Sequence, residues 1–208
     1  MLKQEEDFRL YITEYFSHMH GFGRSMYKVL TDEASSRAAS SIDTLSVLML
    51  RANCLLFTLH VLFNHPASFR TFVASSPSIW WNKRSVLLDV PGFARQIEAG
   101  ETTPRVLIMV GSSEQDVPDP LPPSMTSVLT KKMPFVPSAI RNLIARIVVK
   151  KMMLDFRMVD NARDVAALLQ QIKGGPGYVV RFHAIEDEDH LTASSASIGP
   201  ALAFALRP

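Results

Sequence analysis

The chain has 208 residues, of which 47% are hydrophobic and 20% are charged, and its formal net charge is +2. These proportions are those of an ordinary globular protein and exclude a disordered one. The small net charge gives no argument for binding nucleic acid, and the sequence lacks the run of about 20 apolar residues that a membrane-spanning helix needs.

Two features of the sequence bear on where the protein resides. Residues 1–7 are mostly charged or polar and lack the apolar region of a signal peptide. The single cysteine, Cys54, cannot form an internal disulfide and fits a reducing compartment. We therefore predict a cytoplasmic protein with no stable insertion into a membrane.

Strand and helix patterns alternate along the chain. In order, they predict a short helix at 8–16, a Gly/Ser/Ala-rich connection at 21–41, a strand at 44–50, a helix at 54–63, a strand at 69–74, a helix at 91–99 that ends at Gly100, a strand at 105–111, a proline-rich loop at 112–123, a helix at 159–172, a strand at 178–185 and a helix at 198–206. This alternation predicts an α/β fold with a mostly parallel sheet and helices on both faces. In such sheets ligands bind beyond the carboxyl ends of the strands, which directs attention to the loops at 75–81, 112–119 and 186–190.

Residues 131–151 have the pattern of a basic amphipathic helix. They contain no acid, and their lysines and arginines are Lys131, Lys132, Arg141, Arg146, Lys150 and Lys151. Apolar residues at helical spacing are Ile140, Leu143, Ile144, Ile147 and Val148. We interpret the segment as a core-packed helix with a solvated basic face. The alternatives are a lid over a pocket for anionic substrates and a helix on a membrane surface.

Six short motifs follow one another from residue 56 onward. They are LFTLH at 56–60, NHP at 64–66 with Phe69, ASSPSIWW at 74–81, VG at 110–111 with EQ at 114–115, RMVDNA at 157–162, and EDH at 188–190. In order and spacing these motifs resemble the α/β-hydrolase esterase family that includes the enterobactin-type siderophore esterases. The resemblance implies an enzyme that hydrolyses carboxylic esters of small molecules, siderophore-like esters among them, without a cofactor or metal.

The same resemblance sets the expected domain organisation. It implies one incomplete α/β-hydrolase domain over residues 1–208, with an atypical segment at 1–43 and a family-like half at 44–208. Residues 1–43 are too few for the family's first strands, so we expect an amino-terminally truncated fold that exposes a sheet edge and self-associates through it. The missing loops include one that supplies an oxyanion-hole amide, a loss that lowers the rate by about two to three orders of magnitude.

The nucleophile is where the chain departs from the family. Family members place a serine in a glycine-rich elbow just before the Leu-Phe pair, because the serine occupies a strained strand-to-helix turn. In this sequence Ala52 holds the place of the serine, and Cys54 and Leu55 replace the two glycines. Ala52 cannot attack a carbonyl. Cys54 is the alternative nucleophile, but a lone cysteine amid leucines is typical of a small buried hydrophobe.

The resemblance assigns the acid–base residues to two of the three loops. The family's catalytic histidine corresponds to His190, which can take a proton from a nucleophile and return it to a leaving group. Glu114 holds the place of the acid that orients the imidazole, with Asp116 as its rival; some family members work with a serine and a histidine alone.

The two adjacent tryptophans allow two interpretations. Trp80 and Trp81 can form an aromatic wall against a catecholate or other aryl group, or they can pack in the core beside their loop. The other histidines show no metal-ligand spacing, so we expect no metal site. Two functions remain open: an ester hydrolase, and a catalytically inactive remnant or binding protein that has lost the nucleophile.

Overall fold

The computed structural model describes residues 47–50, 55–121, 131 and 133–206, all within the compact unit Leu45–Pro208. Within these residues, four strands form one sheet: β1 (Val47–Leu50), β2 (Thr71–Ser75), β3 (Arg105–Gly111) and β4 (Val179–Ile185). They lie in chain order, and each neighbouring pair is parallel. The predicted α/β class with a parallel sheet is confirmed.

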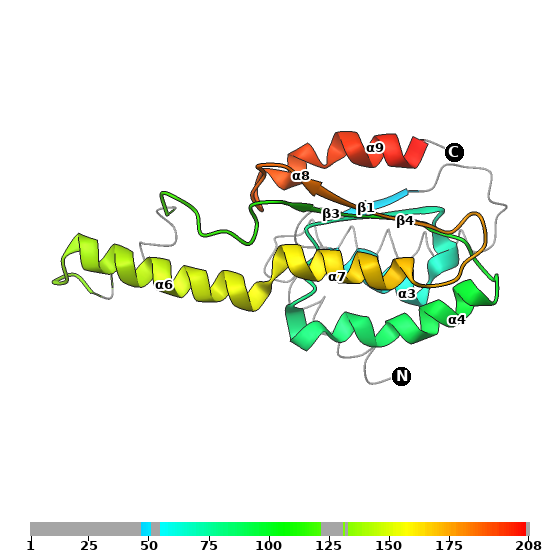
Figure 1. Cartoon of the computed structure of the whole chain (residues 1–208), viewed down its shortest axis with the longest axis horizontal. Helices are drawn as coiled ribbons and strands as arrows, with labels where there is room; N and C mark the ends of the chain where they lie inside the picture. The colour runs from blue at the N-terminus through cyan, green and yellow to red at the C-terminus, as the bar shows by residue number, and fades with distance from the viewer. Residues whose placement is uncertain (1–46, 51–54, 122–130, 132, 207–208) are drawn as a thin grey trace, which may run out of the picture. The chain divides into compact units, whose positions relative to one another are not determined.

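Helices cover both faces of the sheet (Figure 1). On one face α3 (Leu55–Asn64) packs on β1 and β2, while α7 (Met158–Gln170) packs on β3 and β4. The helix α9 (Ile198–Leu206) lies on the opposite face, preceded by the short α8 (Ala193–Ala196). The predicted strand at 105–111 matches β3, and the other predicted strands and helices that fall on described residues agree to within a few residues.

The remaining helical segments connect these layers. A 3-10 turn, η1 (Pro66–Ser68), precedes β2, and a second, η2 (Trp81–Asp89), leads into α4 (Val90–Glu98). As predicted, α4 ends next to Gly100, whose φ of 72° is the left-handed conformation that favours glycine at this position.

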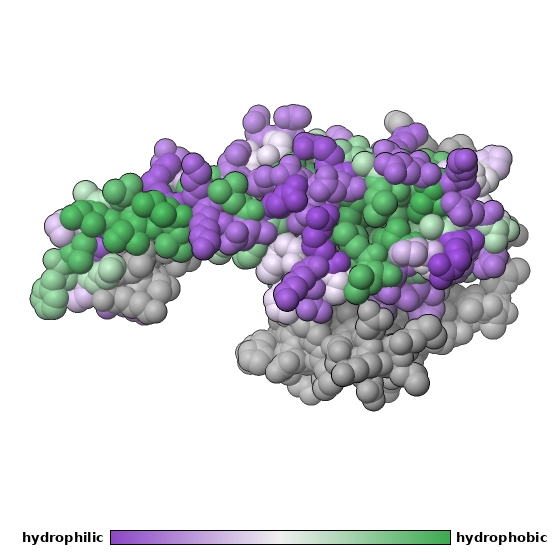
Figure 2. Space-filling model, turned by 60° about the horizontal axis from the view of Figure 1, so that its bottom comes forward, coloured by the Kyte–Doolittle hydropathy of each residue, from purple (hydrophilic) through white to green (hydrophobic). Residues whose placement is uncertain are grey.

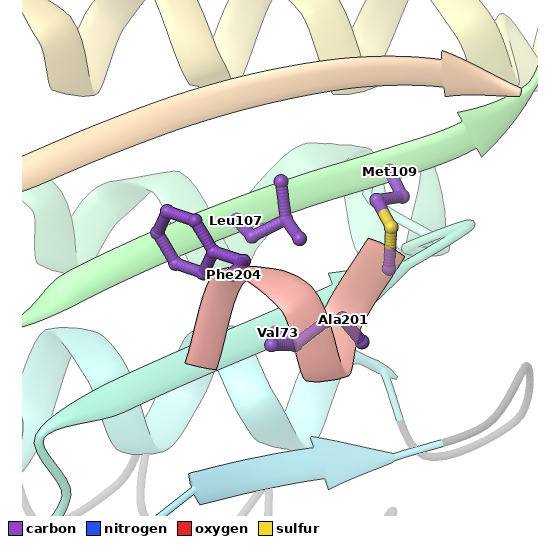
Figure 3. Packing of buried hydrophobic residues seen from close by; sticks show 5 residues of the cluster. All are labelled: Val73, Leu107, Met109, Ala201 and Phe204. Atoms are coloured by element: carbon purple, nitrogen blue, oxygen red, sulfur yellow. The ribbon is translucent and has the colours of Figure 1, made fainter. Parts of the chain in front are cut away.

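The two central strands are buried along their whole length, because they are covered on both faces. Every residue of β2 and of β3 is buried, which explains why both read as continuous apolar runs rather than alternating ones. On the α9 face, the side chains of Val73, Leu107 and Met109 meet Ala201 and Phe204 (Figure 3). This packing fixes the sheet beneath the loops that follow β2, β3 and β4.

The basic helix differs from its sequence interpretation. The helix observed there is α6 (Ser138–Phe156), which begins and ends later than the predicted segment at 131–151, and only Ala145 and Val149 within it are buried. Four of the five apolar residues named from the sequence, Ile140, Leu143, Ile147 and Val148, are exposed, and Figure 2 shows hydrophobic residues gathered at the surface over α6. The interpretation as a core-packed helix was wrong. The helix α6 carries apolar residues on two sides, and only the side with Ala145 and Val149 packs against the protein.

No helix in the described part of the chain combines the length and apolar character that crossing a bilayer requires. The expected self-association through a sheet edge stays a prediction; β1 and β4 are the outer strands of the described sheet.

Candidate active site

The loops that follow β2, β3 and β4 bring three polar side chains together at one edge of the sheet. Ser76 follows β2, Glu114 follows β3 and His190 follows β4. Because the three strands are parallel neighbours, their carboxyl ends share this edge. The structure therefore joins the predicted residues Glu114 and His190 and adds Ser76 to them.

Glu114 is the buried centre of this group. Its side chain is fully buried, and each carboxylate oxygen has its own partners. Oε1 accepts a hydrogen bond from the backbone N–H of Gly111 at 2.7 Å and another from the Ser76 hydroxyl. Oε2 lies 2.7 Å from Nδ1 of His190. A buried carboxylate needs such donors, because burying an unpaired charge is costly.

His190 is held by this carboxylate and remains accessible. Because an ionised carboxylate can only accept hydrogen bonds, Nδ1 is the nitrogen that donates, and the lone pair of the neutral imidazole is on Nε2. The hydrogen bond to Glu114 raises the pKa of His190, against an opposing effect of desolvation. With 42% of its side chain exposed, His190 can reach a substrate or water from Nε2.

A close approach of two loops places His190 over Glu114. A Cβ atom at Gly111 would lie 2.2 Å from the backbone oxygen of Glu188, so only glycine fits at the end of β3. The same Glu188 oxygen accepts the N–H of Ser113 at 3.1 Å, and the Ser112 hydroxyl accepts the N–H of Asp187 at 2.9 Å. These contacts dock the loop after β4 against the loop after β3.

Asp189 organises the turn on which His190 sits. Its Oδ1 accepts the backbone N–H groups of Leu191 at 2.8 Å and Thr192 at 2.9 Å. The backbone hydrogen bond from Thr192 is the largest cause that lowers the pKa of Asp189. The acidic loop that the sequence presents around His190 is therefore a hydrogen-bonded turn.

Ser76 is a site residue that sequence reasoning missed. It is buried, its φ is 57°, and its backbone N–H donates to the Met109 oxygen at 2.7 Å. The backbone thus turns sharply at the end of β2 and directs the hydroxyl toward Glu114. The available signal was its position at the end of a buried strand that neighbours β3 in a parallel sheet.

Two further motif residues meet behind the acid. The side chain of Gln115 donates to Asp160 Oδ2 at 3.0 Å and accepts the Asp160 backbone N–H at 3.2 Å. The side-chain hydrogen bond with Gln115 is the largest cause that lowers the pKa of Asp160. This reciprocal pair ties the Glu114 loop to the first turn of α7.

The two tryptophans occupy different environments. Trp80 stacks on Phe156, the last residue of α6, with ring centroids 4.0 Å apart and planes at 13°. Trp81 packs edge-on against Trp80 and is 39% exposed. One face of the Trp80 ring is therefore covered by Phe156, in agreement with the packing interpretation. The role of either ring in substrate binding stays a prediction.

The other predicted site residues contribute less. Asp116, the rival acid, is exposed, and Glu114 rather than Asp116 contacts His190. Ala52 and Cys54 lie outside the described residues. Among the residues that are described, no group of three or more His, Cys, Asp or Glu side chains is arranged to hold a metal ion.

No model of a known protein family matches the chain, whereas individual proteins do. It is 31% identical over 153 residues to a siderophore triacetylfusarinine C esterase of Aspergillus fumigatus, covering 71% of this chain and 44% of that protein. It is 44% identical over 61 residues to a siderophore enterobactin esterase of Emericella nidulans, covering 29% of this chain and 20% of that protein.

Solved structures of siderophore hydrolases are also similar to the chain. The siderophore hydrolase EstB from Aspergillus nidulans matches with a TM-score of 0.55 and 28% identity, covering 76% of this chain and 48% of that one. EstA from the same organism matches with a TM-score of 0.50 and 29% identity, covering 75% of this chain and 44% of that one. The chain thus spans less than half the length of each of these relatives.

Proposed function

We propose that this chain, whose fold is that of the siderophore esterase-like α/β-hydrolases, hydrolyses carboxylic esters with His190 as general base and acid. The observation that carries the proposal is the 2.7 Å contact between Nδ1 of His190 and the buried carboxylate of Glu114. A histidine oriented through Nδ1 by a buried acid, with 42% of its side chain exposed, is the arrangement that proton transfer in acyl-transfer enzymes requires.

The chemistry follows from this arrangement. Nε2 of His190 takes the proton of a nucleophile, which bonds to the ester carbonyl carbon while the carbonyl electron pair moves to oxygen. When the tetrahedral intermediate collapses, the bond to the leaving alcohol breaks and Nε2 returns the proton to that alcohol. Glu114 stabilises the imidazolium that exists between the two transfers, because its oxygen already faces Nδ1.

With alanine at position 52, we propose water as the nucleophile. His190 can deprotonate water directly, giving acid and alcohol through a single tetrahedral intermediate, without an acyl-enzyme. General base catalysis of this kind contributes about 10²–10⁴-fold, so we expect a slow enzyme. The substrate class is proposed from the relatives, two of which are named for siderophore esters.

A second candidate is a protein that binds an ester without hydrolysing it. The observation that favours it is Ala52, the residue that in the sequence corresponds to the family's serine. Such a protein would retain the Glu114–His190 pair as part of an inherited framework.

Cytoplasmic residence also stays a prediction, supported by the single cysteine.

The test is hydrolysis of p-nitrophenyl acetate and butyrate by the purified chain. His190→Ala should abolish turnover, whereas His183→Ala, which changes an exposed histidine on β4, should leave it intact. Cys54→Ala should also leave it intact if water attacks, and loss of activity would instead identify the thiol. A folded protein with no turnover above the His190 variant would exclude the esterase and favour the binding protein.

A further inference from the structure

The helix α6 has a second apolar surface that the protein does not cover. Ile140, Leu143, Ile147 and Leu154 are spaced three, four and seven residues apart, so they form one stripe along the helix, called here the α6 ridge. Their exposed fractions are 49%, 60%, 60% and 57%. The buried residues Ala145 and Val149 lie on the opposite side of the helix.

Positive charge borders the α6 ridge. On a helical projection Lys150 and Lys151 lie on either side of it, and both are exposed. Neither forms an ion pair with another residue that the structure describes, whereas Arg146 pairs with Asp119 at 2.9 Å. Asp155 is the single acid within α6, so the exposed side of this helix is basic.

A large exposed aromatic residue precedes the helix in the chain. Phe135, three residues before α6 begins, is 99% exposed. A fully exposed phenylalanine next in the chain to an exposed aliphatic stripe is typical of a contact surface.

We propose that the α6 ridge, with Phe135 and the two bordering lysines, docks on an anionic lipid surface. An interfacial helix has this composition: aliphatic and aromatic residues enter the headgroup layer, and lysines at the border reach the anionic headgroups while their methylene stems stay apolar. The 19 residues of α6 give a helix about 28 Å long, which lies along the surface.

The charges argue against protein occupants. A second copy of this chain would bring the same lysines against each other around a shared α6 ridge, and like charges at close range repel. The centres of protein interfaces are also enriched in arginine and tyrosine, and the four members of the α6 ridge include neither. The lipid surface is the occupant that satisfies both the apolar stripe and its cationic border.

Sedimentation of the full chain with lipid vesicles tests this proposal. Vesicles of phosphatidylcholine and phosphatidylglycerol at 3:1 should carry the protein down, and vesicles of phosphatidylcholine alone should not. Lys150→Gln with Lys151→Gln should weaken binding about thirtyfold. Leu143→Asp with Ile147→Asp should abolish it, and because both side chains are exposed, circular dichroism should show an unchanged fold.

Leu202→Asp is the matched control, because Leu202 is a leucine on α9 with 55% exposure; this variant should bind like the parent. Equal binding by the α6 ridge variant and the parent would overturn the proposal, as would no binding to anionic vesicles. A dimer seen by sedimentation velocity and broken by the α6 ridge substitutions would overturn it in favour of a second copy. The readout is independent of ester hydrolysis.

Discussion

A buried hydrogen bond joins Ser76 to Glu114, although 38 positions separate them in the chain. The hydroxyl shares Oε1 of Glu114 with the backbone N–H of Gly111. Oε2 is thereby left to His190. The strand end that precedes the two tryptophans thus takes part in fixing the acid of the candidate active site.

Replacing Ser76 should show what this hydrogen bond contributes to stability. Ser76→Ala leaves Oε1 of the buried carboxylate with one donor, so we expect the free energy of unfolding to fall by about 1.5–3 kcal/mol. Ser76→Gly removes the same hydroxyl but relieves the left-handed backbone at φ 57°, so it should be about 1 kcal/mol more stable than the alanine variant. Urea unfolding measures both, and an alanine variant as stable as the parent would contradict the role assigned to the hydroxyl.

Glu114 should control the titration of His190. Glu114→Gln removes the main cause that raises the pKa of His190, so that pKa should fall toward its ordinary value of 6.5. NMR titration of the imidazole resonances measures it. Asp116→Asn changes the exposed rival acid and should leave the titration unaltered; the opposite pattern would transfer the role of the acid to Asp116.

The same contact makes stability depend on pH. A histidine whose pKa is raised on folding contributes stability that is fully present below about pH 6.5 and is lost as the pH rises through its folded value. The parent should therefore lose stability relative to Glu114→Gln across that window. Urea unfolding series from pH 5 to 9 compare the two, and parallel curves would show that the pair contributes nothing.

Gly111 should resist substitution because of the loop that crosses it. In Gly111→Ala the new Cβ meets the backbone oxygen of Glu188 at 2.2 Å, so we expect a loss of about 1–3 kcal/mol and a His190 pKa nearer 6.5 as the loop moves away from Glu114. Gly92→Ala in α4 is the control, since its Cβ finds no atom closer than 3.8 Å. That variant should gain about 0.5–1 kcal/mol from helix propensity. Equal effects of the two substitutions would contradict the close approach.

The Gln115–Asp160 pair should couple the acid loop to α7. Gln115→Ala should raise the pKa of Asp160 toward 3.8, measured by NMR of its carboxyl carbon. Because the pKa is depressed on folding, the stability from this contact is present above about pH 4 and is lost as the pH falls through the folded value. With the Asp160 side chain 36% exposed, we expect a double-mutant coupling of about 1 kcal/mol or less. Gln171→Ala, which changes an exposed glutamine, should leave the Asp160 pKa and the pH dependence of stability unchanged.

Local sequence was enough to predict the framework. Continuous apolar runs predicted the buried strands, and helical spacing predicted α3, α4, α7 and α9, because each pattern reflects which faces of an element must leave water. The resemblance placed His190 and Glu114 on neighbouring loops. The helix α6 is the exception, because a helix with apolar residues on two sides does not indicate which side packs against the protein.

What the sequence by itself determined is the order of strands and helices and the type of residue at each strand end. Only the tertiary structure decided which of those residues meet. Ser76, Glu114 and His190 lie far apart in the chain and come together because three parallel strands end at one edge. At the end of β3, Gly111 leaves room for the Glu188 backbone, and the loop after β4 can therefore bring His190 to Glu114. The contact of His190 with Glu114 rather than with Asp116 depends on distances that no local sequence pattern contains.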